Sequence, residues 1–163
     1  ERTRHPQPEK AVLEEASRRY EAAVCAGARP IAHGREILAL LQSQDYRLGL
    51  ISNTMFSGAS HRQDLERFGL AEYFETMLFS ADENKWKPNE EAFYQVADAL
   101  QVNPIQAVFV GDDPAADMVG ARRAGMIAVH FPSSSRFQTA DSLLADATIH
   151  TLRELPGVLE QLQ

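Results

Sequence analysis

The chain has 163 residues, of which 44% are hydrophobic and 24% charged, and this balance is typical of one soluble globular domain with a sizeable core. The formal net charge of -7 and the lack of a basic cluster exclude the charge pattern of a nucleic-acid-binding protein. No apolar stretch is long enough to span a membrane, the first ten residues are polar and charged, and a single cysteine excludes an internal disulfide, so we expect a cytoplasmic protein with neither nucleic-acid nor membrane partners.

The N-terminal part of the chain predicts one helix. Residues Glu1–Pro8 are polar and are expected to form an arm. From Glu9 to Ala26, apolar residues recur every four positions, which predicts an amphipathic helix. Cys25 lies on this apolar stripe, so we expect a small core residue and not a catalytic thiol.

Short apolar strands alternate with helices over the rest of the chain. The expected strands are Tyr46–Ser52, Thr76–Phe79, Ala107–Val110, Ile127–Phe131 and Ala147–Ile149. The expected helices are Gly34–Gln44, Ser60–Phe68, a helix capped by Asn89, Pro114–Ala124, and a C-terminal helix that a capping box of Thr151 and Glu154 opens. Pro132–Ser135 is expected to be a loop. This order predicts an α/β fold with a Rossmann-like, mostly parallel sheet and helices on both faces.

An acidic cluster follows the strand Ala107–Val110. Asp112 and Asp113 are adjacent, and Asp117 lies one helical turn later. Packed carboxylates repel one another, and a hard divalent cation such as Mg²⁺ relieves this repulsion. The alternative is that Asp112 or Asp113 only caps the helix that begins at Pro114.

Two further polar segments follow expected strands, where ligands bind in open parallel sheets. Lys87 precedes a proline and a capped helix, so its ammonium can neutralise an aspartate and a phosphoryl oxygen together. Ser52 and Asn53 end a strand, where a hydroxyl, an amide and backbone N–H groups can hold a phosphate oxygen. The alternatives are a surface lysine and an ordinary turn.

These motifs resemble those of the haloacid dehalogenase-like hydrolase superfamily, in the branch with a small helical cap. The resemblance covers about residues 32–130. The matching segments are the strand that ends in Ser52-Asn53, the pair Lys87-Pro88 before a helix, the turn Gly111-Asp112-Asp113 with Asp117, and the tail Val119–Met126.

The resemblance implies a magnesium-dependent phosphatase that acts on a small phosphorylated metabolite through an aspartyl nucleophile. Asp112 would be a direct Mg²⁺ ligand, with Asp113 or Asp117 supporting the ion or its waters. Ser52 and Asn53 would bind the phosphoryl group, and Lys87 would offset charge between nucleophile and phosphate. Residues 1–30 would be a cap-helix remnant and linker, and residues 31–163 the core domain.

The nucleophile of that family is missing from this chain. In the family it is the first aspartate of an Asp-x-Asp motif after a central first strand, and this chain contains no Asp-x-Asp sequence. Without that strand, Tyr46–Ser52 and Ala107–Val110 would leave backbone groups unpaired, at a cost of about 1–3 kcal/mol for each buried group. We therefore expect the strand to lie upstream of Glu1, which is not an initiator methionine, or to come from a second chain.

Direct pairing of Tyr46–Ser52 with Ala107–Val110 would refute this expectation. On its own, the chain is expected not to hydrolyse p-nitrophenyl phosphate with magnesium. For its partners, we therefore expect either a homodimer or a second chain that supplies the missing strand.

Other functions stay open at this point. A haloacid dehalogenase uses the same fold without magnesium, and a mutase differs in its cap. A non-catalytic binding or regulatory domain would explain the absent nucleophile. A receiver-type signalling domain also combines paired aspartates with a lysine, but its acidic pair would come earlier in the chain than Asp112 and Asp113.

Overall fold

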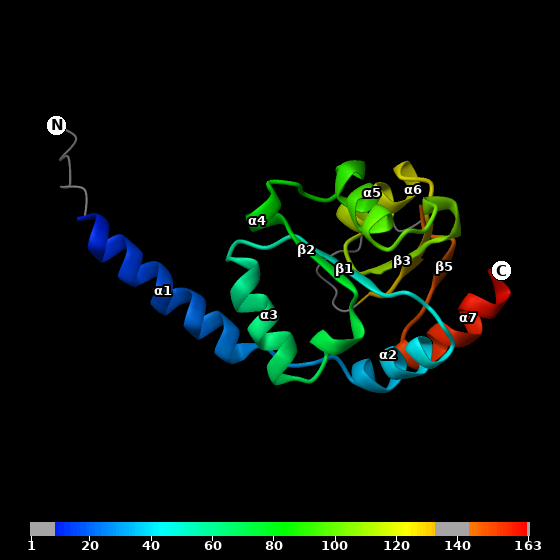
Figure 1. The fold of residues 1–163 in the computed structure, drawn as a ribbon, viewed down its shortest axis with the longest axis horizontal. Helices are drawn as coiled ribbons and strands as arrows, with labels where there is room; N and C mark the ends of the chain where they lie inside the picture. The colour runs from blue at the N-terminus through cyan, green and yellow to red at the C-terminus, as the bar shows by residue number, and fades with distance from the viewer. Residues whose placement is uncertain (1–8, 133–143, 163) are drawn as a thin grey trace.

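The computed structural model describes residues 9–132 and 144–162, and its strands alternate with helices along the chain (Figure 1). The strands are β1 (Gly49–Ser52), β2 (Thr76–Phe79), β3 (Val108–Gly111), β4 (Ile127–His130) and β5 (Ala147–Thr148). The α-helices are α1 (Lys10–Gly27), α2 (Gly34–Ser43), α3 (Gly58–Arg67), α4 (Ser80–Glu83), α5 (Glu90–Ala99), α6 (Val119–Arg123) and α7 (Leu155–Gln161). The expected arm Glu1–Pro8 and most of the expected loop Pro132–Ser135 lie outside the described residues.

The strands form two parallel sheets. In one, β1 pairs with β2, with Ser52 opposite Phe79. In the other, β4 lies between β3 and β5, and Gly111 of β3 is opposite His130 of β4. Within residues 9–132 and 144–162, no strand pairs with the second edge of β1 or of β3, so the direct pairing that would have refuted a missing strand does not occur.

Helices cover the strands on both faces, as the alternation of elements predicts. One core cluster joins both sheets to α5 and α6, and its most buried large side chains are Phe93 and Met118. A second cluster packs α2 and α7 against the other face, around Val129 and Ile149. Figure 1 shows α5 and α6 on one side of the strands and α2 and α7 on the other. The predicted α/β class, a Rossmann-like core, is confirmed.

Local signals set several helix ends. Asn89 caps α5 by accepting a hydrogen bond from the Glu91 N–H at 3.0 Å. Thr151 and Glu154 form the predicted capping box. The segment predicted as one helix from Pro114 differs, because it begins with a π-helical turn, Pro114–Met118, before α6 starts.

Helix α1 projects from the body of the molecule and contacts it through its C-terminal half (Figure 1). Tyr20 packs edge-on against Phe56, and Arg67 of α3 donates to the Cys25 carbonyl at 3.2 Å. No residue of α1 is buried, so the prediction that Cys25 is a core residue is wrong. The apolar stripe was identified correctly, but in the described structure no second layer covers it. None of the described helices has the length and apolarity needed to cross a bilayer.

Candidate active site at the carboxyl ends of β1 and β3

The predicted site residues come from three segments. Ser52 ends β1, the aspartates follow β3, and Lys87 lies in the connection between α4 and α5. Asn53 joins the first and third segments, because its side chain hydrogen-bonds to the backbone of Lys87. The structure therefore brings Ser52-Asn53 and Lys87 together, and Lys87 in turn meets the acidic loop.

Lys87 is not a solvated surface lysine. Its ammonium lies 2.7 Å from Oδ1 of Asp117, and the two side chains are 11% and 3% exposed. The same ammonium lies 5.2 Å from the ring centroid of Phe109, which adds a cation–π contact. The peptide bond between Lys87 and Pro88 is cis. The alternative prediction of a surface lysine is therefore wrong, and a positive charge is held at the carboxyl end of β3.

The acidic loop is organised by its own hydrogen bonds. Oδ1 of Asp113 accepts from the N–H groups of Ala115 and Ala116 at 3.0 and 3.2 Å, so Asp113 caps the turn that begins at Pro114. Oδ2 of Asp117 accepts from the Asp113 N–H at 3.0 Å. The capping role considered as an alternative is confirmed for Asp113, and it uses one oxygen of that carboxylate.

Gly111 makes this arrangement sterically feasible. A β-carbon at this position would overlap the carboxylate of Asp117, which packs against the end of β3. Glycine is the residue that permits such a close approach of a side chain to the backbone. The Gly-Asp sequence thus creates the space that Asp117 occupies beside Lys87.

Asp112 follows Gly111 and is half-buried. Its carbonyl oxygen lies 3.4 Å from Nε2 of His130, a residue that is 7% exposed at the end of β4. The sequence did not point to His130, because its histidines show no metal-ligand spacing. The available signal was that His130 ends the strand next to β3.

Ser80 is a second residue that the sequence did not single out. Its hydroxyl accepts from the Thr54 N–H at 2.8 Å and donates to the Thr54 carbonyl at 3.3 Å, and Ser80 is 1% exposed. This bond fixes the segment that follows Ser52 and Asn53 to the end of β2. A serine directly after a strand was the signal, since such positions line the same edge of the sheet.

The resemblance to the haloacid dehalogenase-like family implies a magnesium ion, and the donors present suit one in part. Within residues 9–132 and 144–162, no group of three His, Cys, Asp or Glu side chains is placed to hold a metal by itself. Protein-bound Mg²⁺ ordinarily uses one or two carboxylates together with waters and substrate phosphates. Asp112, with the remaining oxygen of Asp113, is compatible with such a site, whereas Asp117 is engaged by Lys87.

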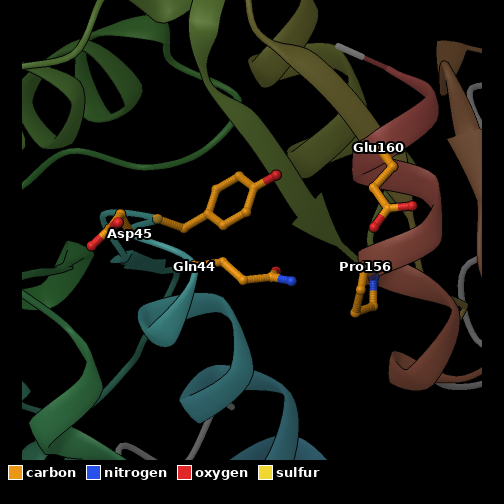
Figure 2. A pocket seen from close by; sticks show the side chains of 5 residues that line it. Gln44, Asp45, Pro156 and Glu160 are labelled. Carbon is orange, nitrogen blue, oxygen red and sulfur yellow. The ribbon is translucent and has the colours of Figure 1, made fainter.

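A shallow hollow elsewhere on the surface does not fit this chemistry. It is lined by Gln44, Asp45, Tyr46, Pro156 and Glu160. Figure 2 shows the side chains of Gln44 and Glu160 directed into it, while Asp45 points away. The hollow lies at the amino end of β1, on the opposite side from Ser52, and the Glu160 carboxylate directed into it would repel a phosphate.

The chain belongs to the haloacid dehalogenase-like hydrolase family. The sequence model described as Haloacid dehalogenase-like hydrolase matches residues 1–131, which is most of the chain. The fold, the Gly-Asp-Asp turn and the buried Lys87 agree with this membership, so the resemblance inferred from the motifs is confirmed.

Several relatives are phosphatases by name. A glyceraldehyde 3-phosphate phosphatase of Methanopyrus kandleri is 30% identical over 129 residues, which cover 77% of this chain and 54% of the relative. That of Pyrococcus furiosus is 27% identical over 135 residues, or 83% of this chain and 55% of the relative. The chain thus spans about half the length of the curated relatives it matches.

Solved structures extend the comparison. A 2-haloacid dehalogenase of Pseudomonas syringae pv. Tomato DC3000 is 32% identical with a TM-score of 0.70, covering 83% of this chain and 55% of its own. The hydrolase YfnB of Bacillus subtilis, a structure bound to magnesium, has a TM-score of 0.77 at 22% identity, covering 94% of this chain and 65% of its own. At that identity the YfnB likeness shows the fold alone.

Proposed function

We propose that the protein is a phosphatase of this family that uses magnesium to hydrolyse a small phosphorylated metabolite. The observation that carries the proposal is the ammonium of Lys87, held beside Asp117 at the carboxyl edge of the sheet and tied to the segment that follows Ser52. A cation fixed at the carboxyl ends of parallel strands is suited to bind an anion with charge spread over several oxygens. The phosphatase names of the curated relatives support the same reaction.

In this proposal each residue has a defined part. The Ser52 hydroxyl donates to a phosphoryl oxygen, together with the backbone of Asn53. The Lys87 ammonium balances charge between the phosphoryl group and the attacking carboxylate, while Asp117 orients it. Asp112, with support from Asp113, would hold the magnesium ion, which supplies further neutralisation of the phosphate oxygens.

The attacking aspartate is proposed to come from a strand between β1 and β3. All four residues of β3 are only half-buried, although a central strand of such a sheet is normally covered on both sides. A parallel strand in this position would end between Ser52 and Asp112. Its aspartate would attack phosphorus, release the alcohol, and form a phosphoaspartate that water hydrolyses. Helix α1 would belong to the cap region.

Phosphate binding tests the proposal without requiring turnover. The chain is titrated with inorganic phosphate by calorimetry, with and without magnesium. We expect magnesium to strengthen binding, and Lys87→Met to weaken it by about tenfold or more, as for loss of a charge-assisted contact. The control is Arg153→Met, which removes a cation whose side chain is 59% exposed in the turn before α7. We expect this control to leave phosphate binding unchanged. A phosphate affinity that changes neither with magnesium nor in Lys87→Met would refute the proposal.

The same chain is expected not to hydrolyse p-nitrophenyl phosphate with magnesium. Activity that Asp112→Ala abolishes would show that the nucleophile lies within these residues after all.

A haloacid dehalogenase is the second candidate, favoured by the 32% identical structure of that name. It would bind a carboxylate substrate and not require magnesium. In the same titration, tighter binding of chloroacetate than of phosphate, unaffected by magnesium, would favour the dehalogenase.

A non-catalytic binding domain is the third candidate, favoured by the absence of an Asp-x-Asp sequence. It predicts phosphate binding without activity even when a strand bearing the motif is supplied.

A further inference from the structure

The side chain of Asn53 makes hydrogen bonds that its position at the end of a strand does not predict. Its Nδ2 donates to the Lys87 carbonyl at 2.9 Å, and its Oδ1 accepts from the Lys87 N–H at 2.8 Å. Both ends of one amide are therefore bonded to both backbone polar groups of one residue. The two residues are 34 positions apart, so these bonds link separate segments.

Lys87 needs such an anchor, because it lies in irregular chain between α4 and α5. Asn84, at the end of α4, has a positive φ of 51°, and the next regular element begins at Glu90. On the inner side, the Lys87 ammonium is fixed by Asp117. The contacts of Asn53 fix the backbone from the side of β1.

The consequence is a fixed position of the Lys87 backbone relative to the segment that begins at Ser52. Asn53 directly follows Ser52, and Thr54 is bonded to Ser80, the first residue of α4 directly after β2. The segment carrying Ser52 is thus held from β2 on one side and joined to Lys87 on the other. A shift of the Lys87 backbone would move the ammonium relative to the hydroxyl.

We propose that the Asn53 side chain is a positioning residue that fixes Lys87, and not a direct ligand of the phosphoryl group. The inference rests on the proposed function only in that Lys87 is taken to contact phosphate. It differs from the expectation drawn from sequence, in which the Asn53 amide itself binds phosphate. Its first test needs no ligand.

The first test measures the acylation rate of each lysine by acetic anhydride and mass spectrometry. The sequence contains three lysines, Lys10, Lys85 and Lys87, so each is resolved in one digest. We expect Asn53→Ala to speed the acylation of Lys87 about tenfold relative to Lys10, whose side chain is 91% exposed, since the Lys87 backbone loses both hydrogen bonds. Equal acylation of Lys87 in the wild type and in Asn53→Ala would overturn the inference.

A matched control separates local positioning from general loss of stability. Asn103 accepts a hydrogen bond from the Ile105 N–H at 3.2 Å in a turn remote from Lys87. Asn103→Ala removes the same kind of amide and should leave the ratio of the Lys87 rate to the Lys10 rate unchanged. A similar rise in both variants would assign the effect to opening of the whole fold and overturn the inference.

A double-mutant cycle in phosphate affinity then distinguishes positioning from direct contact. A residue that acts through Lys87 has no further effect once Lys87 is methionine. We expect Asn53→Ala to weaken phosphate binding in the wild type and to leave it unchanged in Lys87→Met. An equal loss in both backgrounds would make Asn53 a direct ligand and overturn the inference. If the wild type does not bind phosphate, the proposed function fails, and the acylation rates alone decide whether Asn53 positions Lys87.

Discussion

Replacing Lys87 by methionine tests how strongly the buried ion pair contributes to the fold. The charges are 2.7 Å apart, which gives a gross attraction of about 6 kcal/mol at an effective dielectric constant of about 20. Desolvation cancels most of this attraction, so the pair itself adds little. The variant, however, leaves the Asp117 carboxylate buried without its partner, and such truncations cost about 3–5 kcal/mol.

We expect the lower end of that range, a loss of about 3 kcal/mol in the free energy of unfolding, because Asp117 keeps the hydrogen bond from the Asp113 N–H. Methionine retains most of the volume of the lysine stem, so a packing defect adds little. Urea denaturation at pH 7, followed by circular dichroism, measures the difference between Lys87→Met and the wild type.

The matched control is the exposed pair of Arg153 and Glu36, whose side chains are 59% and 56% exposed. Arg153→Met should cost less than about 1 kcal/mol, as exposed ion pairs do. If Lys87→Met costs no more than this control, the Lys87 ammonium is not effectively buried, and the electrostatic argument for the site fails.

Three further substitutions test the acidic turn, with a matched glycine control, and the C-terminal cap. Gly111→Ala should lower the free energy of unfolding by about 1–3 kcal/mol, because the added β-carbon overlaps Asp117. Gly157→Ala in α7 has open space around it and should raise the free energy of unfolding by about 0.5–1 kcal/mol. Equal urea midpoints for the two variants would contradict this expectation. The Glu154 carboxylate has a lowered pKa because it accepts a hydrogen bond from the His150 N–H, with Thr151 contributing further. A carboxylate whose pKa is lowered in the folded state stabilises the fold at pH values above its unfolded pKa of about 4.3, and this stabilisation is lost as the pH falls through the folded-state pKa. The loss of unfolding free energy caused by Glu154→Gln should therefore be present at pH 7 and shrink toward pH 3. A loss that stays constant with pH would refute the charge dependence of the cap.

Much of the fold was predictable because its signals are local. Thr76–Phe79 is apolar and β-rich, and the strand has those bounds. Asn89 and the pair Thr151 and Glu154 mark helix starts by hydrogen bonds made within a single turn. Such signals depend on neighbours in sequence, and therefore survive without knowledge of tertiary contacts.

The sequence predicted which segments lie at one edge of the sheet, but not which atoms of those segments bond to one another. Asn53, Asp113 and Asp117 all carry side-chain oxygen atoms at the edge of a sheet, so the sequence predicted that Asn53 binds phosphate and that the two aspartates support Mg²⁺. The structure directs Asn53 to Lys87, Asp113 to a helix cap and Asp117 to an ion pair. These choices depend on which segments lie side by side, which spacing along one chain does not determine.

The apolar stripe of α1 marks a different limit. Periodicity predicts which side chains share a helix face, but not whether anything covers that face. Val12 and Tyr20 are 56% and 58% exposed, although their spacing is that of a core helix. Cys25 lies on the same face of α1. Partial burial raises the pKa of its thiol, which argues against a reactive thiolate.

Among residues 9–132 and 144–162, β1 and β3 each have one edge that pairs with no strand, and this has a practical consequence for handling the chain. Within the described residues, β3 offers a row of backbone donors and acceptors along an apolar Val-Phe-Val sequence. Open edges of this kind are templates for strand pairing between molecules. We therefore expect concentrated solutions of the chain to associate through this edge of β3, and we expect a peptide that forms a parallel strand along it to reduce that association.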